Sequence, residues 1–430
     1  MNVRLTARWV LPIASPLLED GWVDVDPSRD AILGVGTRAT LNDAHPGRVI
    51  DLGAVVILPG LVNAHTHLEL SHLAGAVPPA PCFVAWVRAM LAARAGIAST
   101  APGDRGALPV DASSVTAAIA RAIDTMTATG TAVVGDIGNT DAAVRPLAAS
   151  ALAGVYFREA LGFRSAHADR LLDDARRDAE RANAVFRAAG RGDLVASIAP
   201  HAPYSTSPPL LAGLAGGMDA ERAVSSVHLG ESPEEVEFLQ TGRGPFRDLL
   251  DDLGAWDETW TPPGIRPAAY VQQCGALHDR LLVVHGTQFD DDDLALVARA
   301  RATLVSCVRS NRWVGAGAPP VAEALAAGVR LAVGTDSLAS VEDLNLFAEL
   351  AALRDVAPGV PAGHLLYAAT RGGALALGCD RFGYLGPGAT TRALVRTPPA
   401  GVTDVEEWLV SGAAETSDLR WLDALVTHAA

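Results

Sequence analysis

Five polar residues, each at the end of a short apolar run, most constrain what this chain can fold into. They are His65 and His67 in LVNAHTH, His228 in AVSSVHLGE, His285 in LLVVHG and Asp336 in RLAVGTD. Short runs rich in Val, Ile and Leu predict buried strands, so each polar residue is expected at the rim of a sheet. Several strand ends converge when the strands are parallel and close on themselves, as in a (β/α)8 barrel. Four imidazoles and a carboxylate at one rim predict a divalent-metal site with hydrolytic potential.

The patterning along the chain predicts where this barrel begins and ends. From Gly60 to Gly378, apolar runs alternate with alanine-rich helical stretches, which is typical of βα repeats. We expect strands at 60–66, 131–136, 153–159, 194–200, 223–229, 281–286, 302–308 and 329–335. Short segments typical of strands and turns precede and follow the repeats. The sequence therefore predicts an α/β protein with a metal-dependent (β/α)8 TIM barrel over 58–378 and a small β-sandwich built from 1–57 and 379–430.

The charge balance and the apolar runs exclude several functional classes. The chain has 49 acidic and 34 basic residues among 430 and a net charge of −15, which argues against binding to nucleic acid or to a membrane surface. No apolar run reaches the length of a membrane span, and the first residues lack the cleavage pattern of a signal peptide. The four cysteines are scattered without a CxxC pair, which favours reduced core thiols. We expect a cytoplasmic protein.

The chain contains no lysine, and all of its basic residues are arginine. Schiff-base catalysis is therefore excluded. A two-metal centre bridged by a carboxylated lysine is excluded as well. A metal hydrolase with this composition is expected to use a single ion.

The spacing of the candidate ligands agrees with metal binding. Residues i and i+2 of a strand point to the same side, so His65 and His67 can reach one ion. His228 is followed by Glu231, for which two interpretations stand: proton transfer beside the metal, or capping of the helix that starts at Ser232 and Pro233.

Three further polar residues near strand ends keep alternative roles. His285 can act as a ligand or as a neutral hydrogen-bond partner that orients a water molecule. Asp336 can ligate weakly and accept the proton of that water, or cap the following helix. His201, just past the fourth expected strand, can contact substrate or form a hydrogen bond within the rim.

Two helix predictions bear on the surroundings of the site. The segment from Pro79 to Gly103 contains a helix in the long loop after the first barrel strand, where it could cap the site. The aspartate run from Asp290 to Asp293 reads as the solvated start of a helix, because it lacks the spacing and glycine of a calcium loop.

These motifs resemble the amidohydrolase superfamily over essentially the whole chain. The resemblance rests on PGLVNAHTHLELS, APHAPYSTS, HLGES, VVHG, SCVRSNRWVG, GTDSLAS and ATRGGALALGCDRFGYLGPGA. The branch is similar to the deaminases of cytosine, guanine and adenosine and to chlorohydrolases, which bind one metal ion. The resemblance implies one zinc or iron ion, and the ligands that it implies are His65, His67, His228 and Asp336.

The resemblance also implies a hydrolytic deamination. Water activated at the metal attacks the amine-bearing carbon of an aromatic heterocycle. Asp336 and His285 take and hold the proton of that water, Glu231 protonates the ring nitrogen, and ammonia leaves.

Within the branch, HTHLELS and SCVRSNRWVG are most similar to aminodeoxyfutalosine deaminases of a menaquinone pathway. Such a substrate is an adenine nucleoside that carries a benzoate, so a cation is expected in the site. Arg309, Arg158 and Arg88 are candidates, each with a structural ion pair as the alternative. Glu69 and Asn311 are candidates for contacts to sugar or base. The implied partner is a small nucleoside-type molecule, and members of this family often form homodimers.

Overall fold

The computed structural model describes residues 2–40, 47–98, 112–216 and 224–427. Eight of its strands form two four-stranded parallel sheets. The first sheet contains, in order, β6 (Leu61–Thr66), β7 (Thr131–Gly138), β8 (Ala153–Ala160) and β9 (Leu194–Pro200). The second contains β10 (Ser225–Leu229), β11 (Leu281–His285), β12 (Thr303–Ser306) and β13 (Arg330–Val333). The predicted parallel α/β architecture is confirmed, and each expected strand lies within a few residues of an observed one, although residue 223 falls outside the described residues.

The two parallel sheets are joined at both edges by individual hydrogen bonds. Between β9 and β10, the Ser225 hydroxyl donates to the Ile198 carbonyl at 2.9 Å and the His228 amide donates to the His201 carbonyl at 2.9 Å. After β13, the amides of Thr335 and Asp336 both donate to the His65 carbonyl on β6 at 3.1 Å. The eight strands therefore follow one another in a cyclic order, with discrete links at these two edges where the other neighbours form ladders.

Helices alternate with these strands along the chain. After β6 come α1 (Phe83–Ala98) and α2 (Ala112–Ala128), and three helices, α6 (Pro233–Thr241), α7 (Pro245–Asp252) and α8 (Pro267–Gln273), separate β10 from β11. The others are α3 (Val144–Ala149), α4 (Ala168–Ala188), α5 (Pro208–Gly216), α9 (Asp291–Ala300), α10 (Val308–Trp313), α11 (Val321–Ala326), α12 (Leu346–Val356), α13 (Ala362–Tyr367) and α14 (Gly373–Ala376), and α15 (Val405–Ser411) lies in the tail. None of the described helices is both long and apolar enough to cross a bilayer.

Two helix starts were readable from local sequence. Asp290 and Asp293 form a reciprocal capping box at the start of α9, which confirms the aspartate run as a helix N-terminus. Ser232 caps α6 by accepting a hydrogen bond from the Glu235 amide, and Pro233 takes the first helical position.

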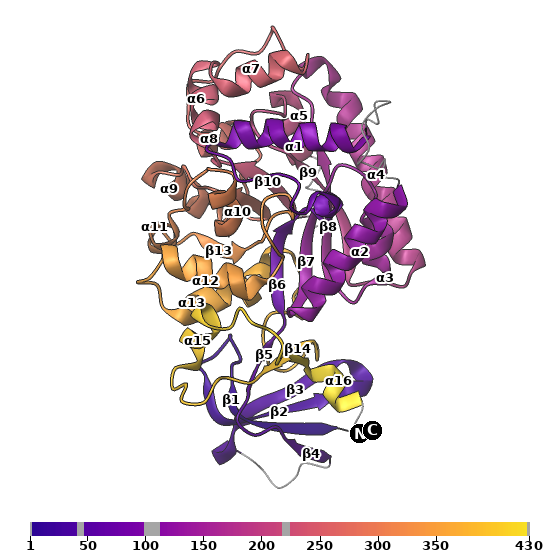
Figure 1. The fold of residues 1–430 in the computed structure, drawn as a ribbon, viewed down its shortest axis with the longest axis vertical. Helices are drawn as coiled ribbons and strands as arrows, with labels where there is room; N and C mark the ends of the chain where they lie inside the picture. The colour runs from indigo at the N-terminus through magenta and orange to yellow at the C-terminus, as the bar shows by residue number, and fades with distance from the viewer. Residues whose placement is uncertain (1, 41–46, 99–111, 217–223, 428–430) are drawn as a thin grey trace.

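Strands from both ends of the chain share a third, mixed sheet. Its members are β1 (Val3–Val10), β2 (Leu18–Asp26), β3 (Ala31–Thr37), β4 (Arg48–Asp51), β5 (Val56–Pro59), β14 (Ala393–Arg396) and β15 (Arg420–Trp421). The order is β15-β14-β5-β1-β2-β3, with β4 paired to β1. Figure 1 shows this sheet at one end of the molecule and α1, α6, α7 and α8 at the other.

The expected β-sandwich is not confirmed, because the described strands of this unit form one sheet. The strands of the tail, β14 and β15, extend the edge next to β5. Leu385 and Ala389, together with Leu422 and Val426 of α16 (Leu422–Thr427), pack in one apolar cluster with residues of the sheet such as Leu5. A loop and a helix therefore help to bury the apolar residues that a second sheet would cover in a sandwich.

Arg396 links the tail of the chain to the helices beside it. Its guanidinium forms an ion pair with Asp418 at 2.9 Å and donates to the carbonyls of Ala413 and Glu415. It also lies over the ring of Phe347 on α12, 4.6 Å from the centroid. Its side chain is only 1% exposed, so all of these partners depend on one buried cation.

We expect Arg396→Leu to lower the free energy of unfolding by about 3 kcal/mol, because it strands Asp418 and two carbonyls without their donor. The control is Arg29→Leu, since Arg29 is 80% exposed and 3.6 Å from Asp26. That change is expected to stay within about 0.5 kcal/mol of the parent. Urea unfolding of both variants measures the difference, and equal midpoints would contradict the role given to Arg396.

Candidate active site

The carboxyl ends of four parallel strands bring the five predicted ligand residues together. β6 supplies His65 and leads directly to His67, β10 supplies His228, β11 ends on His285, and Asp336 follows β13. The nitrogens of His65, His67 and His228 lie within 4.8 Å of one another, and so do the ligand atoms of His65, His285 and Asp336. One site therefore contains donor atoms from strands far apart in the sequence.

Unusual backbone conformations aim two of these side chains. His285 and Asp336 have φ of 76° and 62°, in the left-handed region that non-glycine residues seldom occupy. Gly334 lets the chain pass His65 closely, since a Cβ there would lie 2.8 Å from the Cβ and the carbonyl oxygen of His65. The GTD motif thus combines a close approach with a sharp turn at the strand end.

The imidazole nitrogens face one another across the site. His228 Nδ1 lies 2.9 Å from the His201 carbonyl, so Nδ1 is the donor and Nε2 carries a lone pair. That Nε2 is 3.3 Å from His67 Nε2. Both ring nitrogens of His65 are buried without a hydrogen-bond partner among the described residues.

Burial keeps these rings neutral. It lowers the pKa of His65 well below its ordinary value, that of His67 to about 3 and that of His285 to about 4. For Asp336, burial opposes ionisation, but attraction to the rings of His67 and His285 brings its pKa below the ordinary value. Neutral imidazoles beside an ionised carboxylate are the donor set that a divalent cation requires, and the residues present therefore fit such an ion.

Glu231 and His285 stand beside this donor set. Glu231 Oε1 lies 3.5 Å from His285 Nε2, and His285 Nδ1 lies 2.8 Å from Asn311 Oδ1. Burial, followed by repulsion from Asp336, raises the pKa of Glu231 well above its usual range. Glu235 fixes the turn, because its two carboxylate oxygens accept the amides of Gly230 and Glu231 at 3.0 Å.

A cavity of about 220 Å³ opens above these groups. Its floor is polar and contains His67, His228, Glu231, His285 and Asp336, with His201 at the side. Its roof is apolar and comes from two helices, with Phe83, Trp86, Val87, Met90 and Leu91 on α1 and Phe246, Leu249 and Leu250 on α7. The helix predicted within Pro79–Gly103 is confirmed as α1 and lies over the site, while residues 99–103 fall outside the described residues.

The three arginines proposed for substrate binding are engaged elsewhere. Arg88 pairs with Asp252 at 2.7 Å, Arg158 with Asp178 at 2.8 Å, and Arg309 with Asp343 at 2.7 Å. None of the three lines the cavity above the candidate metal ligands. The structure does not bring them to the site, because a nearer acid holds each guanidinium.

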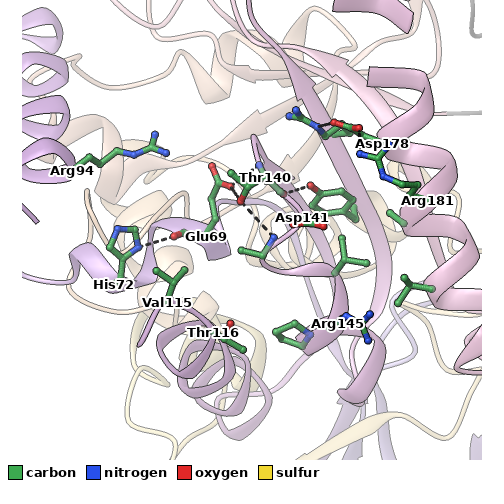
Figure 2. A pocket seen from close by; sticks show the side chains of 17 residues that line it. Glu69, His72, Arg94, Val115, Thr116, Thr140, Asp141, Arg145, Asp178 and Arg181 are labelled. Atoms are coloured by element: carbon green, nitrogen blue, oxygen red, sulfur yellow. Dashed lines mark hydrogen bonds and ion pairs between the residues drawn. The ribbon is translucent and has the colours of Figure 1, made fainter. Parts of the chain in front are cut away.

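Of the other predicted contact residues, Glu69 and His201 line different cavities, and Asn311 lines neither of them. Glu69 lines a wider cavity of about 920 Å³ beside the site, where its Oε2 accepts the Thr140 amide at 3.0 Å (Figure 2). Asn311 is buried under His285, as described above. The ring of His201 packs against that of His228 with centroids 5.0 Å apart, and its Nδ1 lies 2.5 Å from the Ser205 hydroxyl.

Sequence reasoning missed two polar groups of the cavity wall. Glu159 at the end of β8 is buried, and its Oε1 has no hydrogen-bond partner among the described residues and lies 3.6 Å from His228 Nδ1. Asn139 donates to its other oxygen at 2.6 Å. Glu159 follows the apolar run GVYF and so shows the same pattern as the candidate ligands. The role in substrate binding was assigned to the neighbouring Arg158 instead.

Residues 56–396 match the amidohydrolase family. The chain belongs to this family. It is accordingly a hydrolase that acts on carbon–nitrogen bonds, and the relatives are deaminases. An aminodeoxyfutalosine deaminase of Deinococcus radiodurans is 30% identical over 360 residues, covering 81% of this chain and 80% of that protein. A 5-methylthioadenosine/S-adenosylhomocysteine deaminase of Nitratidesulfovibrio vulgaris is 30% identical over 386 residues, covering 86% and 78%.

A solved structure agrees with the fold over nearly its whole length. The aminofutalosine deaminase of Helicobacter pylori superposes with a TM-score of 0.80 at 24% identity and covers 98% of each chain. At this identity, the likeness supports the architecture of the strands and helices that carry the site.

We expect His67→Gln and His228→Gln to lose bound metal, since each removes one of the four expected ligands and weakens affinity by at least about tenfold. The parent should carry about one ion per chain. The control is His72→Gln, because His72 Nδ1 lies 2.8 Å from the Glu69 carbonyl, outside the cluster. Elemental analysis after dialysis measures the content, and full occupancy in the two ligand variants would remove these residues from the site.

Proposed function

We propose that this chain is a metal-dependent aminohydrolase that converts 6-amino-6-deoxyfutalosine to futalosine and ammonia by deaminating its adenine ring. The observation that carries the proposal is the pairing of a metal-ligand floor with an adjacent acid beneath an apolar roof. A flat heterocycle can pack against the roof while its amine-bearing carbon faces the floor.

The relatives support a nucleoside substrate that contains adenine. The names of both curated relatives specify such a substrate, and the two are equally identical to this chain. Deamination of 5′-methylthioadenosine or S-adenosylhomocysteine is therefore the second candidate function. Adenosine or guanine deamination, triazine dechlorination and an inactive barrel remain more distant alternatives, and the intact donor set speaks against the last.

The ion would be held by His65, His67, His228 and Asp336. When bound, a divalent cation in such a site lowers the pKa of a water molecule so that hydroxide is available at neutral pH. Zinc and iron both suit imidazole and carboxylate ligands. The unpartnered nitrogens of His65 and the facing lone pair of His228 are the groups that this ion would satisfy.

Asp336 is oriented for two tasks by its neighbours. Its Oδ2 accepts the hydroxyl of Ser310 at 2.6 Å, so its Oδ1 faces the histidines and lies 3.7 Å from His65 Nε2 and 3.6 Å from His67 Nε2. The free lone pairs of Oδ1 can take a proton from the attacking water. The fixed carboxylate thus serves as ligand and as base without reorganisation.

Glu231 and His285 complete the proton transfers. His285 donates its Nδ1 hydrogen to Asn311 Oδ1. Its Nε2 therefore has a free lone pair, which can accept a hydrogen bond from the attacking water or from protonated Glu231. Glu231 delivers a proton to the ring nitrogen next to the reacting carbon. The water oxygen forms the new bond to that carbon, and the bond from the carbon to the exocyclic nitrogen breaks. One of the two water protons leaves with the amine as ammonia, and the other returns to Glu231 to replace the proton given to the ring nitrogen.

Glu159 offers contacts for the sugar. Glu159 lines the cavity, its Oε1 has no hydrogen-bond partner among the described residues, and a carboxylate oxygen accepts hydroxyl hydrogens well. We assign it to the hydroxyls of the nucleoside, with His201 beside it.

The architecture that supports the site is proposed as a closed (β/α)8 barrel over 58–378, flanked by a composite unit of 1–57 and 379–430. Family membership and the hydrogen bonds between the edges of the two parallel sheets support closure. The pairing of β14 with β5 supports the composite unit.

A substrate panel tests the function. We expect ammonia release from 6-amino-6-deoxyfutalosine with a kcat/KM at least about tenfold above those for adenosine, 5′-methylthioadenosine and S-adenosylhomocysteine, because each missing contact reduces transition-state binding. Preference for 5′-methylthioadenosine or S-adenosylhomocysteine would establish the second candidate. Absence of ammonia release from all four by the metal-loaded enzyme would refute adenine deamination.

We expect Glu231→Gln to lower kcat by about 10²–10⁴-fold, since the amide cannot deliver the proton, while metal content stays unchanged. The matched control is Glu237→Gln, an exposed acid on α6, the helix that follows Glu231. Steady-state ammonia release and elemental analysis are measured on both variants. Equal rates for Glu231→Gln and the parent would remove Glu231 from the mechanism.

A further inference from the structure

Arg94 stands on the apolar face of α1. The residues of this helix that line the cavity are Phe83, Trp86, Val87, Met90, Leu91 and Arg94, spaced i, i+3, i+4, i+7, i+8 and i+11. Such spacing marks one helix face, which here covers the site. A charged residue on that stripe is costly there unless something satisfies it.

No described residue satisfies the Arg94 guanidinium. The half-buried side chain makes no ion pair, hydrogen bond or ring contact with any residue that the structure describes. It lines both the 220 Å³ cavity and the 920 Å³ cavity, so it lies where the two adjoin. Figure 2 shows it extending from α1 toward the side on which Glu69 lies.

The surroundings make this free cation unusual. The chain has 15 more acidic than basic residues, and three arginines near the site are paired with acids. Arg158 pairs with Asp178, as does Arg181, and Arg88 on the same helix pairs with Asp252. Arg94 is also the one arginine among the described residues that lines the cavity above the donor set.

The position of Arg94 separates it from the reacting carbon. The indole nitrogen of Trp86 donates to the Ala339 carbonyl at 3.3 Å, which anchors that part of α1 next to the loop that carries Asp336. Arg94 is eight residues further, about 12 Å along the helix axis at 1.5 Å per residue. The guanidinium thus faces the part of a ligand remote from the donor set.

We propose that Arg94 is a specificity-determining residue that binds a carboxylate on the substituent of an adenine nucleoside remote from its reacting amine. The inference rests on the proposed deamination and names the substrate class of the same site. A planar guanidinium can grip a carboxylate through two parallel hydrogen bonds, and the apolar roof strengthens this attraction by excluding water. Neutral nucleosides gain nothing from this residue.

The test compares Arg94→Met with the parent on substrates with and without a carboxylate. We expect kcat/KM for 6-amino-6-deoxyfutalosine to fall by about 10–100-fold, mostly through KM, as the loss of a charge-assisted contact implies. For 5′-methylthioadenosine we expect a change below about threefold. S-adenosylhomocysteine, which carries a carboxylate on an amino-acid side chain, distinguishes a benzoate from an aliphatic acid as the source of the anion.

Two further variants keep the result specific. Arg88→Met removes an arginine from the same helix that is 44% exposed and paired with Asp252, and it should leave both substrates unaffected. Arg94→Lys keeps the charge without the two-pronged geometry and should recover part of the lost KM. In the parent, added salt should raise KM for the carboxylate substrate alone.

Ligand binding separates this inference from the proposed reaction. The dissociation constants of futalosine and inosine, measured by calorimetry, should differ in the parent and converge in Arg94→Met. If no substrate releases ammonia but the two dissociation constants converge in Arg94→Met, the proposed deamination is refuted and the binding of a carboxylate by Arg94 is supported. Equal losses on carboxylate and neutral ligands, or no loss on either, overturn the role of Arg94.

Discussion

The structure depends on a group of imidazole nitrogens that converge in one buried space at the ends of the parallel strands. Neither ring nitrogen of His65 has a hydrogen-bond partner among the described residues, and His67 and His228 point their Nε2 atoms at each other across 3.3 Å. Leaving such groups unsatisfied costs a few kcal/mol each, and protonation is opposed by burial. A cation removes both penalties, so the folded chain is arranged around a charge that it does not itself provide.

Holding this arrangement requires backbone strain at the strand ends. His285 and Asp336 adopt left-handed conformations that cost roughly 1 kcal/mol each. Hydrogen bonds from the site offset the cost: Asn311 holds the ring of His285, and Ser310 holds the carboxylate of Asp336. Asn311 and Ser310 both lie on α10, so one short helix orients the two strained residues and couples β11, β12 and β13 at the rim.

The sequence determined the floor of the site more completely than its walls. His65, His67, His228, His285 and Asp336 were predictable because each ends a buried strand, and parallel strands bring their ends to one edge. The arrangement of the terminal strands was not predictable in the same way. Strand periodicity does not say whether the strands of the tail extend a sheet or form a second sheet that faces it. Arg88, Arg158 and Arg309 were assigned by position alone, whereas the acids that hold them come from elements distant in the sequence.

The role of Arg94 was not predicted, although the sequence contains the helical pattern that places it. The stripe from Phe83 to Leu91 predicts a helix with one apolar face, and that face is expected to meet a core. Here it meets a cavity, so the arginine that continues the stripe faces a ligand site. Reaction and selectivity therefore reside in different layers: strand ends fixed by hydrogen bonds hold the reacting groups, and a helix in a connecting loop supplies the roof and its single cation. A chain with the same floor and another residue at position 94 would retain the proposed chemistry and select a different nucleoside.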